Sequence, residues 1–223
     1  MASVSAVLRR LAAVAAGLVA ANSWGAAPPD FPFPDGLARA TLASRPATVL
    51  HLGGYAVQFE QTPLQDVVHT LGVGTIEHQG DAGGSLDWIC YDIPGKHSTQ
   101  RLWITSGELQ AGKVADGVIA REVVPALPRT LDCPVLPAKY RPAQIDHEVW
   151  LGSSRAAVDQ ALPPASSERA GWREYEYQGK YRVASPQSGG DANLIDYDEV
   201  NGLLLRLLDG RVVELFANKA TTN

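Results

Sequence analysis

The sequence of 223 residues lacks the patterns that mark nucleic-acid binding and repeated membrane spanning. It has two cysteines and no run of lysines and arginines, and after its first 27 residues no window of 18 apolar residues occurs. Lys plus Arg number 19 against 24 Asp plus Glu, giving a net charge of −5. Because phosphate binding depends on clustered basic side chains, this balance argues against a nucleic-acid partner. A hydrophobic content of 45% is ordinary for a globular chain and excludes a disordered one.

Motifs for metal binding and serine hydrolysis are also missing. No two histidines stand in an H-x-H or H-x-x-x-H pattern, and G-x-S-x-G is absent. Gly84-Ser85 and Ser106-Gly107 come nearest to a nucleophile motif, but both are typical of turns. We therefore expect no metal and no cofactor. The five histidines are His51, His69, His78, His97 and His147.

Paired carboxylates leave one enzymatic alternative open, a small envelope hydrolase that uses Ser or two acids. Glu174 and Glu176 alternate with tyrosines and would share one face of a strand, which is also the pattern of a solvated surface. Whether the protein is an enzyme stays uncertain, and we favour a non-catalytic role. The acids available for such a pair are Glu174, Glu176, Asp196, Asp198 and Glu199.

The first residues have the layout of a secretory signal peptide. Arg9 and Arg10 are followed by an uncharged apolar run over 11–21 and by the small residues Ala21-Asn22-Ser23. The run of eleven residues would span about 16 Å, roughly half of a bilayer core, so an uncleaved anchor is the weaker alternative. We expect residues 1–23 to be removed, with no membrane span afterwards. The protein would then be periplasmic or secreted.

Export changes the meaning of the two cysteines, Cys90 and Cys133. In an oxidising compartment two cysteines usually pair, and no C-x-x-C is present for redox exchange. We therefore predict a Cys90–Cys133 disulfide. It would fasten a Pro-rich connector to a strand.

After a Pro-rich leader over 24–46, one pattern occurs twice in the chain. In the first half, 47–124, a short helix is expected near 63–71, where Leu64, Val67, Val68 and Leu71 form one apolar face. Gly72 would end this helix. The strand-like runs that follow are 85–93, 100–105 and 114–124.

A Pro-rich connector over 125–147 leads to the second half, 148–219. Ser153 or Ser154 would cap a helix that ends before Pro163-Pro164. Asp209-Gly210 lies between two apolar runs and predicts a tight hairpin, because both residues of such a turn need positive φ. The strand-like runs of this half are 172–182, 192–197, 203–208 and 211–217.

The fold class we predict is α+β, with two similar units, each a short helix packed on an antiparallel sheet of about four strands. The segments Gln61–Gly72 with Trp88, and Gly152–Pro163 with Trp172 and Tyr175, carry a topological resemblance. The arrangement resembles the tandem helix-plus-four-strand repeat of secreted β-lactamase inhibitor proteins. It is also similar to the related small lipoproteins of outer-membrane assembly. The alternative is one continuous antiparallel sheet in a single domain.

Aromatic residues in the second half suggest where a partner could bind. Tyr175, Tyr177 and Tyr181 lie with Arg173 in one predicted strand, and exposed Tyr and Arg often anchor protein interfaces. The resemblance implies an aromatic-rich sheet face of this kind. We expect a non-catalytic, inhibitor-like or protein-binding module whose partner is another envelope or extracellular protein.

Overall fold

The computed structural model describes residues 27–32, 42–81, 84–107, 112–123, 133–184 and 194–222, and the protein there is mostly β. The predicted signal peptide (1–23) and residues 124–132, most of them in the predicted connector, lie outside these ranges. The first-half elements are β1 (Val49–Leu52), β2 (Tyr55–Gln58), α1 (Leu64–Leu71), β3 (Glu77–Gln79), β4 (Leu86–Pro94), β5 (Thr99–Gly107) and β6 (Gly117–Val123). The later elements are the 3₁₀ turns Ala138–Tyr140 and Asp146–Glu148, β7 (Ala143–Ile145), α2 (Arg155–Ala161), β8 (Ser167–Arg169), β9 (Trp172–Ala184), β10 (Leu194–Leu208) and β11 (Arg211–Thr222).

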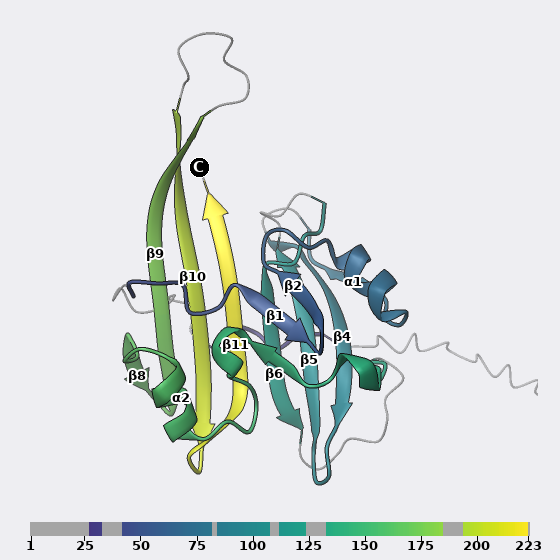
Figure 1. Ribbon diagram of the computed structural model, residues 1–223. Coiled ribbons are helices and arrows are strands. Elements are labelled where there is room, and N and C mark those ends of the chain that lie inside the picture. Colours follow the sequence, from purple (N-terminus) through teal and green to yellow (C-terminus); the bar gives the residue numbers. More distant parts are fainter. Residues whose placement is uncertain are drawn as a thin grey trace, which may run out of the picture.

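Eight of the strands form one antiparallel sheet in the order β3-β4-β5-β6-β11-β10-β9-β8 (Figure 1). The strands of the first half stand on one side in chain order, and those of the second half stand on the other side in reverse order. β6 and β11 meet in the middle, where residues 117–121 pair with residues 214–218. The sheet is therefore continuous across the two halves of the chain.

The prediction of two helix-plus-sheet units is wrong. β6 and β11 would each be an edge strand of a separate unit, and they satisfy their backbone N–H and C=O groups by pairing with each other. A second sheet of three strands, β2-β1-β7, also joins the halves, because β1 comes before the first helix and β7 lies in the connector. The two helices, of eight and seven residues, are too short to cover a sheet of this size.

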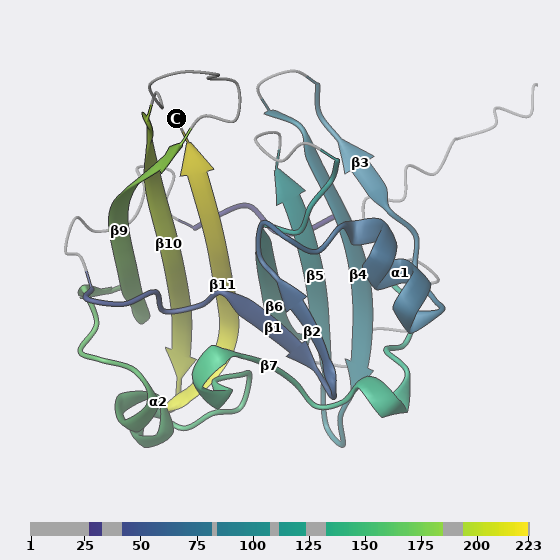
Figure 2. The ribbon, with the colours of Figure 1, turned by 45° about the horizontal axis from the view of Figure 1, so that its top comes forward.

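The small sheet, α1 and α2 lie together on one face of the large sheet (Figure 2). We call this the covered face. The main core fills the space between the layers, and its largest side chains include Phe59, Tyr91, Leu102 and Tyr175. Tyr91 is fully buried, and its hydroxyl donates to the carbonyl of Val73 at 2.9 Å, which satisfies its polar end. No helix among the described residues has the length and apolar character needed to cross a membrane.

Local signals in the sequence correctly placed the end of α1, the start of α2 and one hairpin. Gly72 ends α1 with a left-handed φ of 73°, and the Ser154 hydroxyl accepts the Ala157 N–H at the start of α2. Asp209 and Gly210 both have positive φ and connect β10 to β11. In contrast, the two runs expected over 192–197 and 203–208 form one strand, β10. Asn201 lies in the middle of that strand with its side chain buried. Its amide group is satisfied there by hydrogen bonds to the backbone of Ala47.

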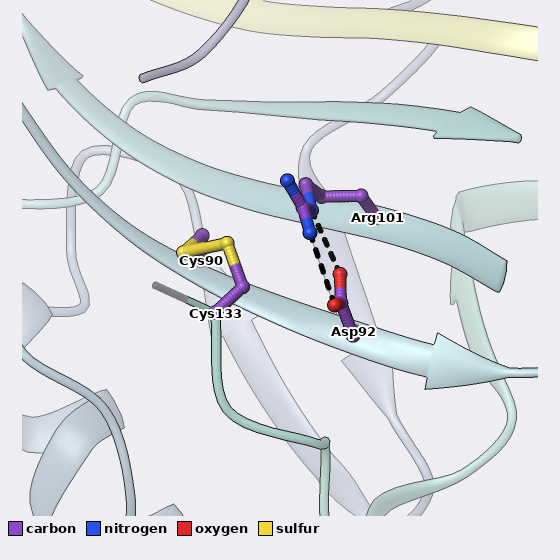
Figure 3. The surroundings of a disulfide bond; sticks show 4 residues. All are labelled: Cys90, Asp92, Arg101 and Cys133. Atoms are coloured by element: carbon purple, nitrogen blue, oxygen red, sulfur yellow. Dashed lines mark hydrogen bonds and ion pairs between the residues drawn. A yellow bond between two sulfur atoms is a disulfide. The ribbon is translucent and has the colours of Figure 1, made fainter. Parts of the chain in front are cut away.

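The predicted disulfide is confirmed, since Cys90 and Cys133 are bonded and their Cα atoms lie 5.1 Å apart (Figure 3). It fastens the connector beside β4, where the Asp92 N–H donates to Pro134 O and the Leu136 N–H donates to Asp92 O, both at 2.9 Å. Beside this attachment the Arg101 side chain donates twice to the Asp92 carboxylate, at 2.8 and 3.1 Å. The disulfide thus holds the connector at the edge of the large sheet.

Replacing both cysteines by Ala should lower the free energy of unfolding by about 4 kcal/mol. The reason is that the bond closes a loop with a sequence separation of 43 residues, which restricts the unfolded chain. Urea unfolding of the variant and of the wild-type protein, each followed by circular dichroism, measures the difference. An equal stability of the two proteins would contradict a structural role for the bond.

Candidate functional site

The second face of the large sheet, which we call the open face, is not covered by any of the helices or strands that the structure describes. Side chains on it form cross-strand rows, because residues directly opposite each other in a sheet point to the same side. One row, the apolar row, contains aromatic and aliphatic side chains beside the disulfide. Its members across five strands are Cys90, Trp103, Ile119, Phe216 and Leu204, and the charged Glu174 stands opposite Leu204 on the next strand.

Small side chains in the neighbouring row leave a hollow in this face. Thr105, Gly117 and Asn218 stand opposite one another there. A Cβ atom on Gly117 would lie 2.8 Å from the Thr105 hydroxyl oxygen and 2.9 Å from the carbonyl oxygen of Ala217, so the packing requires glycine. A pocket of about 400 Å³ opens above this row, with Ile119 and Phe216 of the apolar row in its lining.

The second wall of the pocket comes from the leader. Residues 27–32 pass along the open face, on the far side of the sheet from α1 and the small sheet (Figure 2). Pro28, Pro29, Asp30 and Phe31 line the pocket, and the Phe31 ring meets the Phe216 ring edge-on with a centroid distance of 5.9 Å. Phe31 stays 40% exposed, so the pocket presents an aromatic rim to solvent.

A row of charged side chains, the ionic row, lies next to the apolar row. At its centre Glu214 is buried between two arginines: the Arg121 Nε donates to it at 2.6 Å and an Arg206 nitrogen at 3.5 Å. The Arg206 guanidinium also lies 6.0 Å from the centre of the Trp172 ring. The Glu214 carboxylate is buried against the sheet, and the guanidinium groups of Arg121 and Arg206 lie on its solvent side. The charged members of the row are Asp92, Arg101, Arg121, Glu214, Arg206 and Arg169, and Trp172 stands between the last two.

The serine alternative can be compared with the structure at Ser106. Ser106, Asp87 and His78 form one cross-strand row over β5, β4 and β3. In a catalytic triad the histidine stands between the serine and the acid, whereas here Asp87 is in the middle. His78 Nδ1 lies 3.1 Å from Asp87, and the Lys113 Nζ donates to Asp87 at 2.7 Å. The Ser106 hydroxyl is buried and bonds to no described residue, so this row does not provide an activated nucleophile.

The candidate carboxylate pairs are separated or bonded to other groups. Glu174 and Glu176 lie on the open face, but Glu199 points to the covered face, where Arg45 binds it. Arg169 and Ser167 donate to Glu174, and Gln178 donates to Glu176. Burial raises the pKa of Glu176. Asp196 and Asp198 pair with basic residues on the exposed part of the hairpin.

The four residues predicted to bind a partner lie on one face of β9, the covered-face side, but differ in burial. Tyr175 is buried in the main core, and Arg173 is buried between Asp159 of α2 and Glu168, with which it forms ion pairs. Tyr177 and Tyr181 lie further along β9, on the covered-face side of the sheet. Tyr181 is 39% exposed and stacks on Tyr197 of β10 with a centroid distance of 5.5 Å. A binding role for Tyr177 and Tyr181 stays a prediction, on a surface separate from the pocket.

Sequence reasoning missed the residues that form the pocket and its charged border. Ile119 and Arg121 alternate with buried residues of β6 and read as an ordinary strand. Phe31 belongs to the predicted Pro-rich leader over 24–46, and nothing in the sequence of that segment indicates a contact with the sheet. The pairing of Ile119 with Phe216 joins positions nearly a hundred residues apart, and local patterns carry no signal for it.

Comparisons with known proteins give no family assignment. The chain matches no protein-family model, no curated protein and no solved structure at a significant level. Within the described ranges, no three His, Cys, Asp or Glu side chains are grouped so that they could hold a metal ion. Any function must therefore be argued from the geometry of the open face.

Asp116, which is hydrogen-bonded to Thr105 of the pocket lining, should make stability depend on pH. Burial raises its pKa to about 6, although it accepts hydrogen bonds from the Gly107 N–H at 2.7 Å and from Thr105. Because the folded state favours the protonated carboxyl group, its stabilising effect is complete below the unfolded pKa near 3.8 and disappears as the pH rises through 6.

The variant Asp116→Asn should therefore gain stability relative to the wild-type protein between pH 4 and pH 6. The gain should approach about 1.4 kcal/mol per pH unit at the steepest point. Denaturant unfolding of both proteins at several pH values measures this difference, in which the other titrating groups cancel. A difference that does not change with pH would show that Asp116 titrates normally.

Proposed function

We propose that the protein is a non-catalytic binding module of the cell envelope or extracellular space, and that it holds a side chain of a partner protein in the pocket of its open face. The observation that carries this proposal is the pocket of about 400 Å³ between the leader and the large sheet. Its size lies within the range of natural ligand sites, near the small end. Aromatic and aliphatic groups line it, and polar groups from Thr105, Asn218 and Gln79 stand at its border.

A protein partner is supported by what already lies against this face. The wall contributed by residues 28–31 is an extended polypeptide that places an aromatic ring on Phe216. A segment of another protein could use the same contacts beside it, with one buried anchor residue, as is common at protein interfaces. The disulfide supports an oxidising compartment, in line with the signal-peptide layout of residues 1–23.

Filling the pocket tests its accessibility. The neutral aromatic probe N-phenyl-1-naphthylamine should fluoresce on binding to the wild-type protein. Ile119→Trp places a large side chain in the pocket lining without altering the main core, and should weaken binding of the probe at least tenfold. Val123→Trp is the matched control, because it lies four residues further along the same strand and face but outside the pocket lining. Equal binding by all three proteins would place the probe elsewhere.

The same variants test the partner. The tagged mature protein should capture a specific protein from the envelope fraction of its own cells, Val123→Trp should capture it equally, and Ile119→Trp should lose it. Loss with Tyr181→Ser and not with Ile119→Trp would move the binding surface to the β9–β10 hairpin and contradict our proposal. Turnover of a peptidoglycan or ester substrate by the purified protein would also overturn it.

A further inference from the structure

The centre of the ionic row has more positive charge than its own carboxylate neutralises. Glu214 is one acid between two guanidinium groups. The side chain of Glu214 is only 4% exposed, whereas those of Arg121 and Arg206 are 44% and 52% exposed. The negative charge is thus buried and the positive charges face outward. This arrangement presents N–H donors to solvent at the middle of the open face.

Arg206 has unused hydrogen-bonding capacity. A guanidinium group carries five N–H donors, and Arg206 makes one long contact of 3.5 Å to Glu214 among the described residues. The Trp172 ring beneath it, 6.0 Å away, orients the planar group without using a donor. An arginine held in this way can bind a carboxylate through two parallel hydrogen bonds.

The two arginines lie close to the pocket. Arg121 is two residues from Ile119 on β6, and Arg206 is two residues from Leu204 on β10, which stands opposite Phe216. Two residues of a strand span about 6.8 Å. An extended peptide lying along these strands would therefore place residue i at the pocket and residue i+2 at the arginines.

We propose that the open face recognises an extended peptide segment with the pattern aromatic-x-acidic, whose aromatic ring enters the pocket and whose carboxylate binds Arg206 and Arg121. This inference rests on the proposed function and specifies the chemistry of its partner. A peptide fits better than a lipid, because the pocket is small and its existing wall is an extended peptide with Pro and Phe.

Two short peptides test the recognition of the carboxylate by the arginines separately from the binding of the aromatic ring in the pocket. The probes are acetyl-Phe-Gly-Asp-Gly-amide and its Asn counterpart, titrated into the ¹⁵N-labelled full chain and followed by amide chemical shifts. The wild-type protein should bind the Asp peptide about tenfold more tightly, since a charge-assisted contact is added to the same aromatic contact. This preference should shrink in 0.5 M salt.

Arg206→Gln should remove the preference and bind the Asn peptide as the wild-type protein does. Arg206 is the residue to change, because Arg121→Gln would leave the buried Glu214 with only its long contact to Arg206. Arg155→Gln is the matched control: Arg155 is 49% exposed and ion-paired to Glu168, but its place is on α2. This variant should keep the full preference.

Three results would overturn the inference in distinguishable ways. Equal affinity of the wild-type protein for both peptides, with the naphthylamine probe still bound, would contradict carboxylate recognition by the arginines and leave the proposed function intact. If neither peptide nor the naphthylamine probe binds, both the inference and the proposed function are contradicted. Laurate that binds in the pocket while neither peptide does would make the ligand a lipid.

Discussion

The pairing of β6 with β11 is the interaction on which the rest of the structure depends. Five residues of each strand form this ladder, and it joins the two halves of the chain into one sheet. The same ladder sets Ile119 opposite Phe216 and Arg121 opposite Glu214. The pocket and the centre of the ionic row therefore exist only where the halves meet. Neither half alone contains both sides of either feature.

The two faces of this sheet are stabilised by different means. The covered face is packed against α1, the small sheet and α2, and burial of apolar area dominates there. The open face has no second layer among the described elements. It is stabilised by the packing of Trp88 and Trp103 around the disulfide, by aromatic contacts, and by ion pairs in which one partner is buried. The leader covers part of it and leaves a hollow. A surface that is apolar in one row and charged in the next is suited to a partner that carries both kinds of group.

The sequence allowed the local features to be predicted and not the assembly. Gly72, Ser154 and Asp209-Gly210 act through contacts within a few residues, so their effects are visible in the sequence. The disulfide was predictable because only two cysteines exist. The union of the halves and the pairing of β1 with β7 involve long-range contacts between short or ordinary strands. Local periodicity predicts that such strands exist but not which edge each one meets.

The candidate site follows the same division. Glu174 and Glu176 share one face, as alternation within a strand requires, and the tyrosines between and after them point to the other. Which face of the large sheet is covered depends on the small sheet formed by β1, β2 and β7. The sequence near residue 175 does not indicate which face that sheet packs against. Tyr175 therefore read as a surface candidate although it is a core residue. The residues of the pocket gained their position only from the junction.

Hydrogen–deuterium exchange at the junction tests this account most directly. We predict that the hydrogen-bonded amides within 117–121 and 214–218 exchange only through global unfolding, with the same free energy as the protected amides of β5 and β10. If these amides exchanged at much lower free energy than the strands on either side, the two halves would be separate units in solution. The β6–β11 pairing that forms both the pocket and the centre of the ionic row would then be absent in solution.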